Sequence, residues 1–245
     1  MPPRTELLIS EITLMGPGFC VIGLERVNQG FRSLRPIPRS SFSWPSFGYK
    51  RGDRVAFELS RIPARQPHTE DRQAGNHHSM GSLSDHELLQ RLKQAEVAGS
   101  IRELFSCDVH PSPRGGDAVY VSPNEATRSI CGCAITAVTF SFRFFPKIRV
   151  ALALTSGETL QSLPLVDTEW TKFALEIGTD IESGQHDQTR LQHFFDYFVQ
   201  EEISSSELRF ARIGLSRPDK DGFCWLMLDS LFPLPQKHWL SGQDV

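Results

Sequence analysis

Strand-like segments fill the first quarter of the chain. They are rich in apolar and β-branched residues, and short turns containing glycine separate them. In the last of them alternate positions are apolar, which is typical of a strand with one buried face. Several strands joined by short connections predict a small β-barrel. The segments are residues 7–15, 19–24, 31–35 and 54–59.

The hydrophobic period then changes to that of a helix. Ser84 and Glu87 fit a capping box, in which the serine accepts an early backbone N–H and the glutamate reaches back. Leucines at helical spacing follow, and Gly99-Ser100 interrupts the pattern before it resumes. We predict a broken helix from residue 84 to about residue 105, packed across one end of the barrel. The polar stretch before it, residues 73–81 with His77-His78, is predicted to be an exposed loop.

The second half of the chain returns to strand character and contains the clearest helix. Residues 189–203 carry apolar side chains at positions i, i+3, i+4, i+7 and i+8, which make one wide apolar face. Strands are expected at residues 129–145, 147–154, 160–166, 207–215 and 223–233. Each half therefore reads as a small barrel with one packed helix, although no sequence repeat relates the halves. The side chains expected in the core of the helices are Leu88, Leu92, Phe194, Phe195 and Phe198.

Composition places the chain among globular proteins, and its charge is unevenly distributed. The 245 residues carry a net charge of −3. Residues 26–72 hold ten Lys and Arg against four Asp and Glu, whereas residues 128–245 hold eleven against fifteen. The whole protein is therefore no general polyanion binder, but a local basic field in the first half can attract phosphate. The alternative is that these arginines only solvate strand edges.

The five cysteines are scattered, and we expect them to be reduced thiols in a cytoplasmic protein. Cys131 and Cys133 are too close for a usual zinc pair and are expected to be buried as small apolar side chains. Neither a structural metal nor a disulfide is expected. No signal peptide is apparent at Met1, and no apolar run reaches the roughly 18 residues that span a membrane.

The strong catalytic motifs are missing. The sequence has no P-loop, no dinucleotide-binding glycine pattern, no His-Glu-x-x-His and no Gly-x-Ser-x-Gly. Nucleotide hydrolysis, dinucleotide redox chemistry, metalloprotease action and ordinary esterase action are therefore disfavoured. We expect a protein without a cofactor that binds rather than catalyses.

Two groups of residues carry candidate chemistry. His68, Glu70 and Asp71 place three titratable groups within four residues, where His68 or Glu70 could move a proton or the three could hold a divalent ion weakly. The alternative is structural, with His68 and Asp71 satisfying buried backbone groups at a barrel corner.

The second group consists of arginines. Arg32 and Arg35 lie three apart on one strand and so point to opposite faces, and Arg217 repeats the Arg-Pro step of Arg35 late in the chain. Arginine suits bidentate contact with phosphate or carboxylate. The alternative is that each Arg-Pro step ends a strand and that the arginine pairs with a local acid such as Asp219.

These motifs together resemble the bacterial dual-OB-containing domain family, from about residue 12 to about residue 235. The matching stretches are Cys-Val-Ile-Gly (20–23), Arg-Ser-Leu-Arg-Pro-Ile-Pro (32–38), Gly-Asp-Arg-Val-Ala-Phe-Glu-Leu (52–59), Pro-His-Thr-Glu-Asp (67–71) and Arg-Ile-Gly-Leu-Ser-Arg-Pro (212–218), with a Cys-Trp-Leu strand (224–226). The resemblance implies two OB-like barrels in one mainly β unit with two packed helices. It also implies nucleic-acid or nucleotide binding in bacterial defence or nucleic-acid processing, with Arg35, His68, Glu70, Asp71 and Arg217 at motif positions.

Together these inferences predict a first OB-like barrel with its helix at 1–110, a linker at 111–128, and a second OB-like barrel with an inserted helix at 129–245. The expected function is non-catalytic binding of a nucleic acid or nucleotide by the first barrel. The alternatives are an adaptor that binds a protein partner through Phe-rich surfaces, and a metal-assisted enzyme acting on nucleic acid. The second half is acidic and its aromatic residues lie in apolar phase, which favours a restricted ligand or a protein partner over general single-strand binding.

Overall fold

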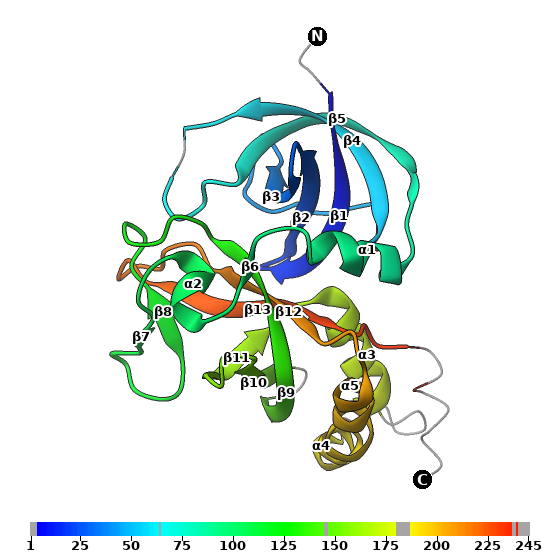
Figure 1. Ribbon diagram of the computed structural model, residues 1–245, viewed down its shortest axis with the longest axis vertical. Coiled ribbons are helices and arrows are strands. Elements are labelled where there is room, and N and C mark those ends of the chain that lie inside the picture. Colours follow the sequence, from blue (N-terminus) through cyan, green and yellow to red (C-terminus); the bar gives the residue numbers. More distant parts are fainter. Residues whose placement is uncertain (1–3, 64, 145–146, 180–186, 237–238, 240–245) are drawn as a thin grey trace.

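The computed structural model describes residues 4–63, 65–144, 147–179, 187–236 and 239. It shows two β-rich units, one above the other in Figure 1, with a short helix, α1, at their junction and the remaining long helices beside the lower unit. The chain is mainly β, as predicted.

The upper unit is a closed barrel of five strands. Their order around the barrel is β1-β2-β3-β5-β4, in which β3 and β5 are parallel and the other neighbours are antiparallel. This is the strand order of an OB-fold barrel. Alternate apolar residues, among them Leu7, Val21 and Phe57, fill the interior. The strands are β1 (Arg4–Met15), β2 (Gly18–Val27), β3 (Gly30–Ile37), β4 (Asp53–Arg61) and β5 (Asp71–Ser82).

The predicted loop at residues 73–81 is wrong, because this stretch belongs to β5. His77 pairs with Phe57 and His78 with Ala56 along the antiparallel β4–β5 ladder. The side chains of this half of β5 are exposed, so their polarity reflects contact with water and not the absence of a strand.

Helix α1 (Asp85–Leu92) lies between the two units. The predicted capping box is present, with the Ser84 side chain accepting from the Glu87 backbone and the Glu87 side chain accepting from the Ser84 backbone. The apolar face of α1 packs on Leu8 and Leu24 of the barrel and also on Phe210 and Phe232 of the lower unit. A break is present before α2 (Ile101–Phe105), but it is longer than predicted: α1 ends at Leu92 and the two-residue strand β6 (Val97–Ala98) precedes Gly99-Ser100, so residues 93–98 are not helical.

The lower unit repeats the strand order of the upper one. β9 pairs with β10 and β12, β10 with β11, and β12 with β13, all antiparallel. A parallel pairing of β11 with β13 at Leu165 and Leu228 joins the ends of this path. The third and fifth strands are thus parallel neighbours in both units, so the lower unit is a second OB-like barrel. The strands are β9 (Ile130–Phe144), β10 (Lys147–Leu154), β11 (Thr159–Leu165), β12 (Phe210–Leu215) and β13 (Cys224–Phe232).

Helices connect the third and fourth strands of the second barrel. The predicted helix at 189–203 is confirmed as a continuous run of three segments, the middle one π-helical. Phe195 is fully buried, and Phe194 and Phe198 pack on the same core. The sequence patterns did not single out α3, which Asp167 caps. The segments are α3 (Thr168–Gly178), α4 (Gln188–Phe194), η1 (Phe195–Val199) and α5 (Gln200–Ser205).

The segment between the barrels extends the second sheet. The hairpin of β7 (His110–Pro111) and β8 (Val119–Val121) pairs with β13. Cys131 and Cys133, in β9 of the same sheet, are buried as expected. The domain boundaries at 110 and 129 stay a prediction.

Candidate functional site

Five of the six predicted site residues lie together where the barrels meet. The parallel pairing of β3 with β5 sets Arg35 opposite Asp71, and the Arg35 backbone N–H donates to the Glu70 carbonyl at 3.1 Å. His68 and Glu70 lie in the β4–β5 loop, and Arg217 follows β12 of the second barrel. We call Arg35, His68, Glu70, Asp71 and Arg217 the junction cluster.

Arg35 is the centre of the junction cluster and is only 4% exposed. One terminal nitrogen donates to Asp71 Oδ1 at 3.0 Å and to His68 Nδ1 at 2.9 Å, and the other donates to Ser129 Oγ at 3.0 Å. Burial alone would lower the pKa of Arg35, but the nearby groups of Cys20, Asp71 and Glu70 raise it above its ordinary value. Arg35 is therefore a fixed positive charge.

His68 is held as a neutral ring. Its Nδ1 accepts from Arg35, so the proton lies on Nε2, which donates to the Ser216 carbonyl of the second barrel at 3.2 Å. Burial, together with the charges of Arg35 and Arg217, lowers the pKa of His68 to about 2. Both ring nitrogens are thus engaged, which leaves His68 poorly suited to act as a base or a metal ligand.

Asp71 joins the two arginines. Its Oδ1 accepts from Arg35, and its Oδ2 lies 2.7 Å from Nη2 of Arg217 across the junction of the barrels. The alternative that Arg217 pairs with an acid holds, but the acid is Asp71 and not Asp219, which pairs with Arg114 at 2.8 Å. Asp71 begins β5 and Arg217 follows β12, whereas Asp219 contacts Arg114 in the loop of the β7–β8 hairpin.

Glu70 accepts two hydrogen bonds from the residue that precedes the second barrel. Its two carboxylate oxygens accept from the Ser129 backbone N–H at 2.6 Å and from the Ser129 hydroxyl at 3.0 Å, just before β9 begins. Burial raises the pKa of Glu70, against the effects of Arg35 and of the Ser129 hydrogen bonds. His68, Glu70 and Asp71 therefore each contact the second barrel.

Arg32, the sixth predicted residue, lies apart from the cluster. It is exposed on β3 and pairs with Glu25 at 2.5 Å. Arg32 and Arg35 do point to opposite sides of the strand, as their spacing predicts.

Two further buried ion pairs that the sequence analysis missed cross the junction. Arg212 donates to Glu11 at 2.9 Å, with both side chains fully buried, and Arg51 donates to Asp167 at 2.5 Å. Arg212 is the one charged residue of the apolar β12, and Glu11 is the one charged residue of the mainly apolar stretch 7–15; these charges are the sequence signal that could have found the pair. With Asp71–Arg217, three carboxylate–arginine pairs between described residues join the barrels.

The contacts of the junction cluster indicate first a structural role, because they tie the barrels together. Across the described ranges, no three His, Cys, Asp or Glu side chains are grouped so that they could hold a metal ion. A cavity of about 340 Å³ nevertheless opens beside the cluster and is lined by Arg35, His68 and Arg217. Cys20 and Asp229 also face it.

Cys20 and Asp229 were not predicted as site residues. Burial raises the pKa of the Cys20 thiol against the effect of Arg35. Burial, reinforced by Glu11, raises the pKa of Asp229 to about 7 against the effects of Arg35 and Arg212. Asp229 is an acidic residue in the otherwise mainly apolar β13, so its unusual position can be recognised from the sequence.

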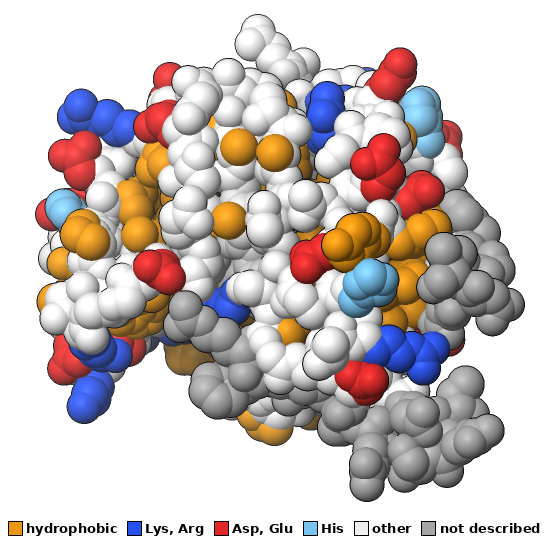
Figure 2. All heavy atoms as spheres, turned by 90° about the horizontal axis from the view of Figure 1, so that it is seen from below, with side chains coloured by type: hydrophobic (Ala, Val, Ile, Leu, Met, Phe, Trp, Pro, Cys, Tyr) orange, Lys and Arg blue, Asp and Glu red, His pale blue; other side chains and the backbone are white. Residues whose placement is uncertain are grey.

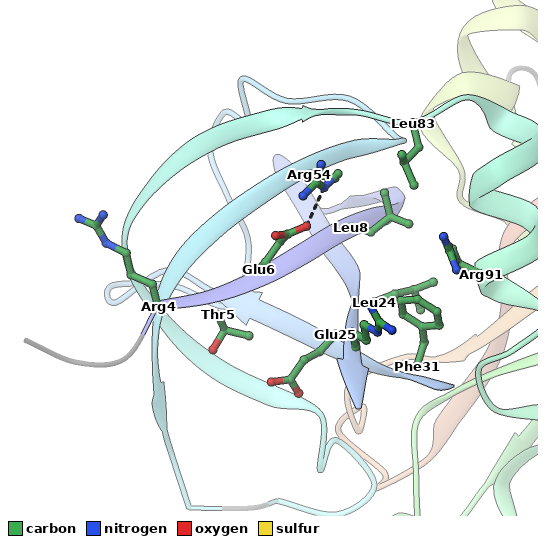
Figure 3. Close-up of a pocket in the computed structure, with 11 residues that line it drawn as sticks. Arg4, Thr5, Glu6, Leu8, Leu24, Glu25, Phe31, Arg54, Leu83 and Arg91 are labelled. Carbon is green, nitrogen blue, oxygen red and sulfur yellow. Dashed lines mark hydrogen bonds and ion pairs between the residues drawn. The ribbon is translucent and has the colours of Figure 1, made fainter. Parts of the chain in front are cut away.

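A second, larger hollow of about 560 Å³ lies on the first barrel, and Figure 3 shows its lining. Leu8 and Leu24 on β1 and β2 form an apolar floor with Leu83. The arginines around it come from three strands and from helix α1. We call this hollow the arginine groove, and its arginines are Arg4, Arg26, Arg54 and Arg91.

The arginines of the groove differ in their partners. Arg54 donates to Glu6 at 2.6 Å, the contact dashed in Figure 3. Arg91 lies over the ring of Phe31, 5.5 Å from its centroid. Within the described parts of the chain, neither Arg26 nor Arg91 pairs with a carboxylate, and both are exposed. The groove thus offers two available guanidinium groups beside an aromatic ring.

The remaining surface is less distinctive. Acidic and basic side chains are interspersed on the described part of the face in Figure 2, which views the molecule from the side of the second barrel. Within the described ranges no helix is both long and apolar enough to cross a membrane. Among the described residues, the exposed large apolar side chains include only one phenylalanine. These side chains are Leu14, Phe42, Met80, Val97, Leu175 and Tyr197.

Comparison of the chain with family models, with curated proteins and with solved structures gave no match.

Proposed function

We propose that this protein is a non-catalytic module that binds a nucleic acid or nucleotide in the arginine groove of its first barrel. The observation that carries the proposal is the position of Arg26 and Arg91 beside Phe31 above an apolar floor. Proteins that bind single strands combine a basic groove for the phosphates with aromatic rings on which bases stack. OB folds bind such ligands on the face of their second and third strands, which supply Arg26 and Phe31 here.

The junction cluster is not assigned a direct contact with the ligand's phosphates. Arg35 and Arg217 are engaged with Asp71, so the phosphate contacts are assigned to the groove and not to these residues. Arg32 lies at the edge of the groove through its pairing with Glu25 and is a further candidate for phosphate contact. The proposal includes a cytoplasmic location and the bacterial defence or nucleic-acid-processing setting that the family resemblance implies.

A salt-titrated binding measurement with a fluorescent single-stranded oligonucleotide tests the proposal. Arg26→Ala and Arg91→Ala should each weaken binding about tenfold, since a hydrogen bond to a charged group contributes roughly 1.5–3 kcal/mol. Each should also flatten the dependence of log K on log salt by about 0.7. Arg102→Ala, which removes an exposed arginine on α2, is the matched control. Failure to bind at low salt, or equal binding by all variants, would overturn the proposal.

A further inference from the structure

The cavity between the barrels lies where ligand-binding loops of two OB-like barrels meet. The β1–β2 turn supplies Gly16, the β4–β5 loop supplies His68, and the β12–β13 loop supplies Arg217. The β12–β13 loop is the counterpart, in the second barrel, of the β4–β5 loop in the first. In OB folds the loops after the first and fourth strands contact the ligand. At about 340 Å³ the cavity suits one small group and not a strand of several nucleotides.

The carboxyl group of Asp229 lines this cavity. Asp229 is 3% exposed, and no hydrogen bond from the described residues reaches its carboxyl group. Buried polar groups are nearly always satisfied, because leaving one without a partner is costly. The cavity therefore presents an acceptor that a bound guest could satisfy.

The backbone holds the Asp229 carboxyl group in place. The β12–β13 register pairs Arg212 with Ser230 and Ile213 with Leu228, so Asp229 is the extra residue of a β-bulge. A Cβ at Gly214 would lie 2.0 Å from Asp229 Oδ2, so only glycine on the neighbouring strand leaves room for the carboxyl group. Bulges commonly re-aim a side chain next to a functional site.

The remaining walls of the cavity are mostly apolar. Met15, Leu215 and Met227 line it, and the 46% exposed Leu14 lies at its edge towards solvent. Thioether and methyl groups suit the face of a flat ring. Because Asp71 already neutralises Arg217, the site favours an uncharged planar guest with donors on one edge and acceptors on another.

We propose that this cavity is a pocket for a single guanine base, an inference that rests on the proposed binding of nucleic acid or nucleotides. The two oxygens of Asp229 would accept from the adjacent N1–H and N2–H donors of guanine. Asp71 engages Nη2 of Arg217, so another nitrogen of this guanidinium would donate to O6 of guanine. The other common bases do not present two adjacent ring-edge donors of this kind, so the arrangement predicts preference for guanine.

Calorimetry with free nucleosides tests this pocket without involving the groove, because nucleosides carry no phosphate. Guanosine should bind the intact protein about tenfold more tightly than inosine, which lacks the N2 amino group, or than adenosine. Asp229→Asn should weaken guanosine binding at least tenfold, whereas Asp221→Asn, an exposed carboxylate outside the cavity, should leave it unchanged. Arg26→Ala/Arg91→Ala should retain guanosine binding even where it loses oligonucleotide binding, so the two proposals can fail separately.

A second readout does not depend on any variant folding. Cys20 is the only one of the five cysteines that is not buried, and it lines the cavity. Alkylation of Cys20 can be measured over time by mass spectrometry. Saturating guanosine should slow this alkylation about tenfold, and adenosine should leave its rate unchanged. Absent guanosine binding, equal binding of all nucleosides, or unchanged alkylation of Cys20 would each overturn the proposal.

Discussion

At the scale of single residues, the burial of charge determines the protonation and the hydrogen bonding of the junction cluster. Arg35 and Asp71 are buried and joined, and His68 accepts one hydrogen bond and donates another. A neutral, fully hydrogen-bonded imidazole fixes geometry, but it cannot take a proton without losing its contact to Arg35. Protonation of His68 is therefore coupled to unfolding.

This coupling gives a pH prediction for His68. The ring has a pKa of about 2 in the folded protein, against 6.5 for an unperturbed histidine. Below pH 6.5 the unfolded chain takes up a proton that the folded chain does not, so stability falls as the pH falls. The free energy of unfolding should lose about 1 kcal/mol per pH unit from this group between pH 6 and pH 4.

Urea unfolding at a series of pH values measures this effect as the difference in slope between the parent and His68→Gln. His86→Gln removes an exposed imidazole on α1 and serves as the control. Identical slopes for the parent and His68→Gln would show that the pKa of His68 does not differ between the folded and unfolded chains.

The sequence predicted which residues gather at the junction better than it predicted how they pair. The short motifs around Arg35, His68 and Arg217 marked all three, because polar groups beside prolines at strand ends are unusual. Their partners depend on which strand end meets which, and sequence spacing carries no such information. Asp229 shows the same limit. An acidic residue in an apolar strand can be recognised in the sequence, but the β-bulge that directs its carboxyl group towards the cavity cannot.

At the scale of elements, periodicity predicted most strands and the two clearest helical regions. It failed for β5, where an exposed strand has the composition of a loop, and it left α3 unassigned. In both cases pairing or packing with a distant element decides the conformation. The helix formed by α4, η1 and α5 shows the opposite case, because its phenylalanine stripe alone predicts which side is buried.

That stripe supports a stability prediction. Phe195 is fully buried, with ring centroids of Phe140 and Phe142 each 4.9 Å away. Phe195→Ala should lower the free energy of unfolding by about 3–5 kcal/mol, from lost burial and the cavity left behind. Tyr197→Ala, two residues along and 74% exposed, should change it by less than about 0.5 kcal/mol. Chemical denaturation compares the two, and a small effect of Phe195→Ala would mean that the stripe is not core.

At the scale of the whole molecule, the junction between the barrels is unusually rich in charge. Arg212–Glu11, Arg51–Asp167 and Arg217–Asp71 cross it, and α1 contributes the apolar part of the contact. Buried ion pairs add little net stability, but the loss of one partner is costly because the other is left buried and uncompensated. The two barrels should therefore unfold together.

The Glu11–Arg212 pair tests this expectation. Arg212→Met should lower the free energy of unfolding by about 3–5 kcal/mol, and Glu11→Leu/Arg212→Met should recover most of the loss. Arg32→Met, which breaks the exposed pair with Glu25, should cost less than about 1 kcal/mol. Equilibrium denaturation followed by fluorescence measures all three. Two separate transitions in the parent protein would contradict the expected joint unfolding.

The charged junction also has a consequence for biosynthesis. The strands of the first barrel are complete at Ser82, but Arg212 and Arg217 leave the ribosome more than a hundred residues later. At about 5–20 residues per second, the nascent barrel waits roughly 7–27 s with Glu11 and Asp71 lacking those partners. During that interval both carboxylates stay in contact with water, because no arginine is present to pair with them when they are buried. A chain truncated before residue 212 should therefore have a loosened first barrel and should become a substrate for chaperones and proteases.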